Sequence, residues 1–253
     1  MKRTLQWMFA GVFMAGVAFA PVAHGYAIFS GEDLNSSATT RLASTPNASA
    51  ASAAFLGSLI GVGTETFEGF AAGTSAPLNL TFPGAGAATL SGGSGSIVSV
   101  GPGVTNGFGR YPISGTNFWQ VDAGGGGNFT VTFGAPVAAF GFWGVDIGDF
   151  GGQVTLLLAN GTATVLNVGN TQGTGGSTDG SVLFYGLIAQ GAGELFTGIT
   201  FQTTTGQGNV FAFDDMTIGS LQQVRGVPEP GSLALLAIAL LGAGGVRSLR
   251  KRS

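Results

Sequence analysis

Residues 128–168 read NFTVTFGAPVAAFGFWGVDIGDFGGQVTLLLANGTATVLNV, and this stretch decides the fold that the sequence predicts. Short runs of apolar or alternating residues are separated by glycine-rich breaks, which is the pattern of β-strands joined by turns. Asn160-Gly161 lies between two such runs, and an Asn-Gly pair in that position is a strong signal for a tight hairpin. The stretch therefore predicts consecutive antiparallel strands.

The same pattern extends on both sides of this stretch. We expect eleven strands, at residues 64–70, 78–82, 96–100, 117–121, 128–133, 137–146, 153–159, 163–168, 181–188, 195–202 and 209–218. No long amphipathic helix alternates with them, which argues against a parallel α/β sheet. No internal repeat is visible, which argues against a propeller or a β-helix. We therefore predict an all-β, jelly-roll-like β-sandwich over residues 63–220.

Residues 26–62 have a different composition, and we predict a polar segment that contains one short helix. The polar part is rich in Ser, Thr and Asn and is typical of a loop. Residues 48–60 are rich in alanine, which favours a helix, and Asn47 or Ser49 is suited to be its N-cap. We expect this helix to pack on the sandwich through Phe55, Leu56 and Leu59.

Composition narrows the classes of function. Only 8% of the 253 residues are charged, against about 25% in typical domains. The 20 phenylalanines nevertheless supply a core, which a disordered chain would lack. Cysteine is absent, and the only histidine, His24, lies in a segment that we expect to be removed. Disulfides, thiolate or imidazole metal sites and a Ser-His-Asp triad are therefore excluded from the mature chain.

The basic residues are concentrated at the two ends of the chain. Residues 26–226 contain eleven acidic residues but only Arg41, Arg110 and Arg225 as basic ones, which gives this part a formal charge of −8. Such a body repels nucleic acids and anionic membrane surfaces. We therefore expect no nucleic-acid partner.

The N-terminus has the order of regions that defines a secretory signal peptide. Lys2 and Arg3 are followed by an uncharged, mostly apolar stretch at residues 5–20 and by small residues near Gly25. We predict a cleavable signal helix at residues 1–25, with cleavage after Gly25 or after Ala27.

The C-terminus combines three features in order. Pro228-Glu229-Pro230 follows a linker predicted at residues 221–226 and precedes fourteen uncharged residues, 233–246. As a helix this run spans roughly 21 Å, short of the roughly 30 Å hydrocarbon core of a bilayer. A basic cluster on the cytoplasmic side would hold it in the membrane. That cluster comprises Arg247, Arg250, Lys251 and Arg252.

Residues 227–253 resemble the PEP-CTERM sorting segments of exported proteins of Gram-negative bacteria that make exopolysaccharide. The resemblance implies that an exosortase recognises Pro228, Glu229 and Pro230 and cleaves the chain near them. The apolar run would then be a transient transmembrane helix in the inner membrane, and the released body would reach the cell surface or the medium. A permanent single-span anchor is the alternative.

The body also resembles a group of exported PEP-CTERM proteins, for which the resemblance implies no activity. The stretches that carry this resemblance are GRYPISGTNFW (109–119), FGFWGVDIGDFGG (140–152) and FAFDDMTIG (211–219). A last strand that ends in an FDD sequence, together with the early TFEGF (66–70), is similar to β-sandwich carbohydrate-binding modules.

Two acidic clusters are candidate calcium sites. Asp146 and Asp149 lie in a glycine-rich turn that could wrap around a hard cation such as Ca²⁺. Asp214 and Asp215 end the last strand, and we expect this strand to lie beside the first, which brings Glu68 near them. The alternative is that these carboxylates accept hydrogen bonds from turns.

Arg110, Tyr111 and Trp119 are candidate glycan-binding residues, because aromatic faces stack on sugar rings and guanidinium groups bind hydroxyls. The alternative is that the two rings belong to the core.

Taken together, these features lead us to expect an exported, non-enzymatic protein of the cell surface or of the exopolysaccharide matrix of a biofilm, stabilised by calcium. The alternatives are a secreted carbohydrate-binding module and a glycoside hydrolase that uses two carboxylates.

Overall fold

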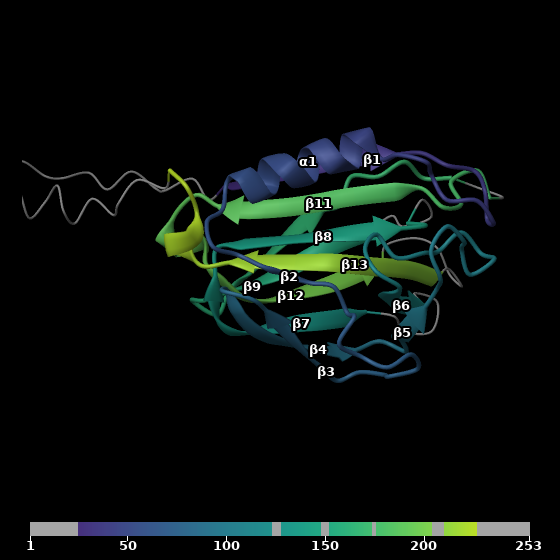
Figure 1. Cartoon of the computed structure of the whole chain (residues 1–253). Coiled ribbons are helices and arrows are strands. Elements are labelled where there is room, and N and C mark those ends of the chain that lie inside the picture. Colours follow the sequence, from purple (N-terminus) through teal and green to yellow (C-terminus); the bar gives the residue numbers. More distant parts are fainter. Residues whose placement is uncertain (1–24, 123–127, 148–151, 174–175, 204–209, 227–253) are drawn as a thin grey trace, which may run out of the picture.

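The computed structural model describes residues 25–122, 128–147, 152–173, 176–203 and 210–226. They form two antiparallel β-sheets packed face to face, with one helix on the outside of the first sheet (Figure 1). The predicted all-β sandwich and its short helix are confirmed. The predicted signal helix and C-terminal transmembrane helix lie outside the described residues, and among the described ones no helix is long and apolar enough to cross a membrane.

The first sheet has seven strands. They are β1 (Tyr26–Asp33), β2 (Thr64–Glu65), β5 (Ser96–Ser99), β6 (Asn117–Asp122), β8 (Ala139–Val145), β11 (Val182–Ala189) and β13 (Val210–Gly219). Their order is β1-β11-β8-β13-β6-β5, and β2 pairs with β13 on the same side as β6. The long strand β13 therefore pairs along one edge with two shorter strands, β6 and β2.

The second sheet has six strands. They are β3 (Leu78–Phe82), β4 (Gly86–Gly92), β7 (Phe129–Val137), β9 (Gly152–Leu158), β10 (Ala163–Asn167) and β12 (Phe196–Thr203). Their order is β10-β9-β12-β7-β4-β3. The hairpin predicted at Asn160-Gly161 is confirmed, because β9 and β10 pair directly across it and Gly161 has a φ of 86°.

All eleven predicted strands are present, although the one expected at residues 64–70 is only the two residues of β2. Two strands were missed. Residues 26–33 were expected to be loop, but they form β1, paired along its whole length with β11. β4 is rich in glycine and alanine, which have low strand propensity, and it is held by pairing with both β3 and β7.

The main core lies between the sheets and is built of phenylalanines. Phe129 stacks on Phe201 with ring centroids 4.3 Å apart and planes at 10°. Phe142 and Phe213 meet Phe201 edge-on at 5.0 and 5.2 Å. Each of these rings comes from an inward-facing position of its strand, so strand alternation places the aromatic residues in one layer.

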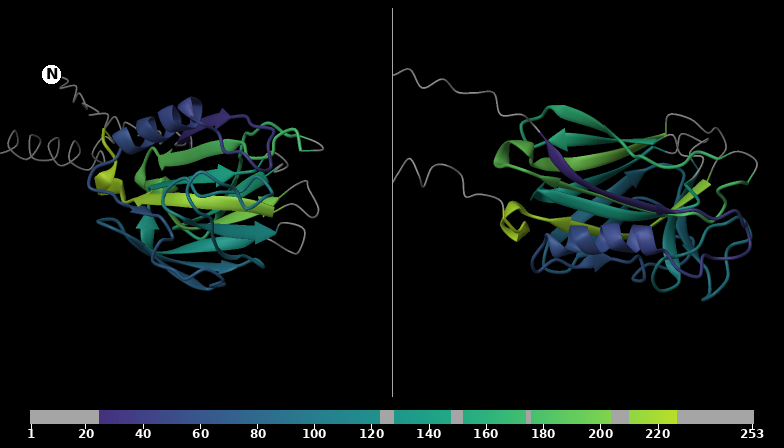
Figure 2. Two further views of the ribbon diagram at one scale, coloured as in Figure 1. Left: turned by 45° about the vertical axis from the view of Figure 1, so that its right-hand side comes forward. Right: turned by 90° about the horizontal axis from the view of Figure 1, so that it is seen from above.

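The helix α1 (Pro46–Gly57) covers the outer face of β1 and β11 (Figures 1 and 2). Phe55 is fully buried in a slot between Gly141 and Gly186, which are paired across β8 and β11. A Cβ atom at either glycine would lie 2.7 Å from the Phe55 ring, so glycine is required there.

Two expectations for the helix are corrected. Leu59 is buried as expected, but Leu56 is 40% exposed because it lies on the outer side of the helix. Neither Asn47 nor Ser49 is the N-cap. Thr45 is at that position, and its side chain does not cap the backbone of the first turn. The carboxylate of Asp33 on β1 instead accepts hydrogen bonds from the backbone N–H groups of Asn47 and Ala48.

Residues 221–226 were predicted to be a linker, but they belong to the folded body. The Gln223 side chain donates to the backbone oxygens of Gly61 and Gly84, and the backbone N–H of Arg225 donates to Ser58. Ala27 and Gly226 line one cavity of about 390 Å³, so the described chain begins and ends at the same end of the sandwich.

Removal of the Phe55 ring tests how α1 is attached. Phe55→Ala empties the glycine slot and should lower the free energy of unfolding by about 3–5 kcal/mol. Leu56→Ala is the matched control on the same helix and should change it by less than about 0.5 kcal/mol. Urea unfolding measures both, and equal losses for the two variants would contradict this packing.

Candidate functional site

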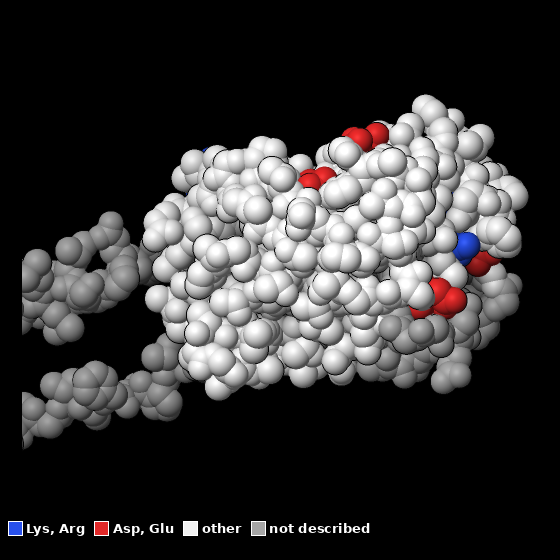
Figure 3. All heavy atoms as spheres, turned by 90° about the horizontal axis from the view of Figure 1, so that it is seen from below, with Lys and Arg blue, Asp and Glu red and all other residues white. Residues whose placement is uncertain are grey.

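The charged side chains are few and unevenly distributed. On the face of the molecule shown in Figure 3, most of them lie in the half away from the end where the described chain begins and ends. The same distant end contains the loops that precede β6 and follow β8. This loop end is therefore the candidate site.

Strand β13 has an irregularity at the point where its neighbour changes. Residues 210–213 pair with β6, Met216 and Thr217 pair with β2, and the register against β8 shifts between Asp214 and Thr217. Asp215 has a φ of 45°, which is uncommon for a residue other than glycine. The sheet thus has a break between β2 and β6, with two carboxylates beside it.

Three carboxylates bind the loop 113–117 at this break, and we call them the carboxylate clasp: Asp214, Asp215 and Glu68. Asp214 Oδ2 accepts from the backbone N–H groups of residues 113 and 114 at 2.7 and 3.2 Å. Asp215 Oδ1 accepts from the Ser114 hydroxyl at 2.6 Å. Glu68 Oε1 accepts from the backbone N–H groups of residues 116 and 117 at 2.8 and 2.6 Å. The side chains thereby satisfy amide groups that no neighbouring strand reaches.

Glu68 lies directly across Gly115, which explains the glycine. Gly115 has a φ of 57°, and a Cβ atom there would collide with the Glu68 carboxyl group. The SGT turn in this loop therefore fits the clasp in both conformation and space.

Asp214 is fully buried, and its titration is strongly shifted. Burial and then the charge of Asp215 raise the pKa of Asp214 to about 8, although hydrogen bonds from Ser114, Asp215 and Ile113 act in the opposite direction. Burial also raises the pKa of Asp215, and the charge of Glu68 adds to that effect.

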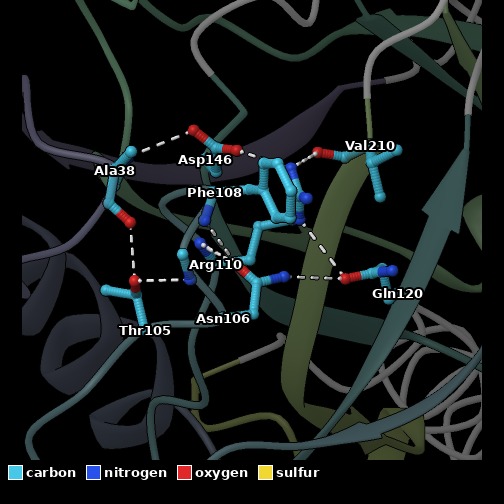
Figure 4. A network of polar contacts seen from close by, with 10 residues as sticks. Ala38, Thr105, Asn106, Phe108, Arg110, Gln120, Asp146 and Val210 are labelled. Carbon is cyan, nitrogen blue, oxygen red and sulfur yellow. Dashed lines mark hydrogen bonds and ion pairs between the residues drawn. The ribbon is translucent and has the colours of Figure 1, made fainter.

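A second polar network surrounds Arg110 (Figure 4). Its Nη1 atom lies 3.1 Å from Asp146 Oδ2 and also donates to the backbone oxygen of Val210 at 3.2 Å. Its Nε atom donates to Gln120 Oε1 at 3.3 Å. The Arg110 and Asp146 side chains are only 12% and 13% exposed. Burial raises the pKa of Asp146 to about 7, against the lowering effects of Arg110 and of the Gly180 N–H group.

The Arg110 network supports an exposed aromatic residue. Asn106 Oδ1 accepts from the N–H groups of Phe108 and Arg110, which closes a tight loop. The Phe108 ring is 66% exposed and lies against the guanidinium group, whose carbon is 5.4 Å from the ring centroid (Figure 4). Among the described residues, Phe108 is thus an aromatic side chain that this end of the sandwich presents to solvent.

The structure separates the predicted calcium ligands into two groups. Glu68, Asp214 and Asp215 do come together, as expected from the neighbouring strands, but their oxygens accept hydrogen bonds from the clasped loop. Asp146 is in the Arg110 network, and Asp149 lies outside the described residues. Within the described ranges, no three acidic side chains are arranged to hold a metal ion. Calcium binding therefore stays a prediction.

The prediction that Tyr111 and Trp119 stack on a glycan is wrong. Trp119 is fully buried between the sheets, and Tyr111 is 4% exposed, so neither can stack on a sugar. Tyr111 instead donates to Gly180 and accepts from the Leu42 N–H group. Sequence reasoning missed Phe108, although its position in NGFG, between two turn glycines, was a usable signal.

The end of the described body coincides with a known motif. Residues 226–251 match the PEP-CTERM protein-sorting motif. The chain carries a PEP-CTERM sorting signal. It is therefore an exported protein that is sorted to the cell surface through a transient stage at the membrane. The match includes Pro228, Glu229 and Pro230 and three of the four basic residues, and Arg252 follows it. All of these predicted sorting residues lie outside the described ones.

Comparison of this PEP-CTERM protein with solved structures finds distant β-sandwich domains. The K2 cleaved adhesin domain of Lys-gingipain has a TM-score of 0.40 at 15% identity and covers 62% of this chain and 97% of its own. A family 22 carbohydrate-binding module of Clostridium thermocellum Xyn10B has a TM-score of 0.34 at 13% identity, covering 66% and 94%. No curated protein matches the chain. None of these similarities supports a functional argument.

The raised pKa values predict how stability depends on pH. Asp214 and Asp146 hold a proton more tightly in the folded than in the unfolded chain, where such a group titrates near 3.8. The stability that these two protonated groups contribute is fully present below about pH 4 and is lost as the pH rises to about 7–8. Over that range the free energy of unfolding falls by up to about 1.4 kcal/mol per pH unit for each group. In Asp214→Asn the free energy of unfolding should decrease less steeply with pH than in the wild type. Urea unfolding at pH 5, 6 and 7 measures this, and an unchanged slope in the variant would contradict the assignment.

Proposed function

We propose that the chain is an exported, non-enzymatic component of the cell surface or of the exopolysaccharide matrix. In this proposal an exosortase removes its C-terminal anchor near Pro228-Glu229-Pro230. The PEP-CTERM motif supports the sorting part of the proposal. The proposed localisation after cleavage is outside the inner membrane, with the matrix polysaccharide as the neighbouring material.

The use of the carboxylates is the observation that supports a non-enzymatic body. A glycoside hydrolase that works with two carboxylates needs them on either side of a cleft that admits the sugar. Here the oxygens of Asp214, Asp215 and Glu68 accept hydrogen bonds from the chain's own loop, and Asp146 is paired with Arg110. These acids act as scaffold for the loop end, which argues against the hydrolase alternative.

The intact mass of the protein recovered from the cell-surface and matrix fractions tests the sorting part. We expect a chain that lacks the apolar run and the basic cluster, and Glu229→Ala with Pro230→Ala should leave these residues in place and the protein in the membrane fraction. A surface-exposed chain that still ends at Ser253 would refute removal of the anchor.

Glycan binding is a second candidate function, and the exposure of Phe108 favours it. An exposed aromatic ring backed by a guanidinium group offers a sugar both a stacking face and a hydrogen-bonding edge. Gln120 and Asn106 lie within the same network and supply amide groups. We propose the matrix exopolysaccharide as the ligand of this surface.

Affinity electrophoresis in gels that contain the purified exopolysaccharide tests this second candidate. Phe108→Ala should abolish the retardation of the wild-type protein. Val165→Ala is the matched control, because Val165 is also exposed, at 54%, but lies on β10 of the other sheet. Equal retardation of both variants and the wild type would rule out Phe108 as the contact.

Calcium stabilisation remains part of the proposal for the turn that contains Asp146 and Asp149. The melting temperature in millimolar Ca²⁺ should then exceed that in a chelator, and Asp149→Asn should remove the difference. Equal melting temperatures in both media would eliminate the calcium site.

A further inference from the structure

The carboxyl group of Glu194 lies where the described chain begins. Glu194 ends the short 3₁₀ turn η2 (Ala192–Glu194) and is only 4% exposed. Its Oε1 accepts from the Gly25 N–H group at 2.5 Å, and its Oε2 accepts from the Gln190 N–H group at 2.6 Å. A carboxylate at this depth needs strong compensation for the water that it has lost.

Tyr26 is the first strand residue of the described part of the chain. It begins β1, and its hydroxyl group donates to the backbone oxygen of Glu194 at 2.8 Å. Its ring meets Phe196 edge-on at 6.2 Å. Cleavage after Ala27 would remove all of these contacts, whereas cleavage after Gly25 leaves β1 complete. Cleavage after Gly25 would therefore preserve the contacts of Tyr26 that cleavage after Ala27 would remove.

We propose that Glu194 binds the α-ammonium group that removal of the signal peptide creates at Tyr26. The inference rests on the predicted signal peptide and on the export that the proposed function requires. Hydrolysis of the Gly25–Tyr26 bond consumes one water molecule. Gly25 leaves with the signal peptide as a carboxylate, and the Tyr26 nitrogen becomes an ammonium group.

The new ammonium group is created within reach of the carboxylate. The nitrogen atoms of Gly25 and Tyr26 are three covalent bonds apart, so a rotation of the Glu194 side chain brings an oxygen to the second nitrogen. The neutral donor Gly25 N–H is then replaced by a cation with three donors, which compensates a buried carboxylate better. The charge of Glu194 already acts on this residue, because burial and that charge together raise the pKa of the Tyr26 hydroxyl to about 12. Backbone sites that capture an N-terminal amine are a known recognition mode.

The composition of the chain makes this ion pair easy to measure. Residues 26–226 contain no lysine, so the proposed ammonium group is the only amine of the mature body. Acetylation of that body by an amine-reactive ester therefore reports on Tyr26 alone, and peptide mapping separates any label on Lys251.

The test uses the exported protein as wild type, Glu194→Gln and the control Glu65→Gln. Glu65 also accepts two backbone N–H groups, but it lies on β2. We expect N-terminal sequencing to begin at Tyr26. Acetylation should be about tenfold slower in the wild type and in Glu65→Gln than in Glu194→Gln, because an ion pair that raises the amine pKa by one unit has that effect. Acetylated wild-type protein should melt about 4 °C lower than unmodified protein.

Several outcomes would overturn this inference. A chain that begins at Ile28, or acetylation rates that are equal in the three proteins, excludes Glu194 as the binding partner. If acetylation leaves the melting temperature of the wild-type protein unchanged, Glu194 is also excluded as the binding partner. This measurement needs no variant. An exported protein with another N-terminus leaves the proposed function intact, whereas a retained signal segment in a protein that stays inside the cell refutes both.

Discussion

The structure of the loop end depends on hydrogen bonds from the loop 113–117 to the side chains of the carboxylate clasp. Where β13 changes its neighbour from β6 to β2, the sheet cannot supply acceptors for the loop 113–117, and the clasp of Asp214, Asp215 and Glu68 supplies them. Asp214 is fully buried and would be costly to bury without these hydrogen bonds. In a body with so few charges, the acidic residues are used mainly to hold the chain in shape.

This constraint joins three segments that are far apart in the sequence. Residues 109–119 contain the clasped loop and Arg110, residues 140–152 contain Asp146, and residues 211–219 contain Asp214 and Asp215. Arg110 binds Asp146, the loop binds the aspartates of β13, and β13 pairs with β8. The described parts of these three segments therefore meet at one end of the sandwich, and Phe108 is exposed there. The opposite end contains both ends of the described body, and Glu194 lies beside the first of them.

Much of the fold could be predicted because strand periodicity and glycine turns are local signals. The strands missed were those without such signals. β1 ends in Gly-Glu-Asp, and its pairing with β11 brings together segments about 150 residues apart. The candidate site was predicted only in part. The expectation that the first and last strands lie side by side correctly brought Glu68 near Asp215. The sequence did not show which side chains of the site would be buried. Trp119 and Phe108 are both aromatic residues next to turns, and only the packing shows that the first is core and the second is exposed.

Hydrogen exchange at the backbone amides of the clasped loop tests the central claim most directly. Apart from Asn117, which begins β6 and is paired with β5, this loop is not part of a strand, and such a loop would ordinarily exchange quickly. The N–H groups of Ile113, Ser114, Thr116 and Asn117 should exchange as slowly as those in the centre of β13, and Asp214→Ala, which removes the acceptor oxygen, should accelerate the first two selectively. Exchange as fast as that of the exposed turn at Gly101 and Gly103 would show that the carboxylates do not hold the loop.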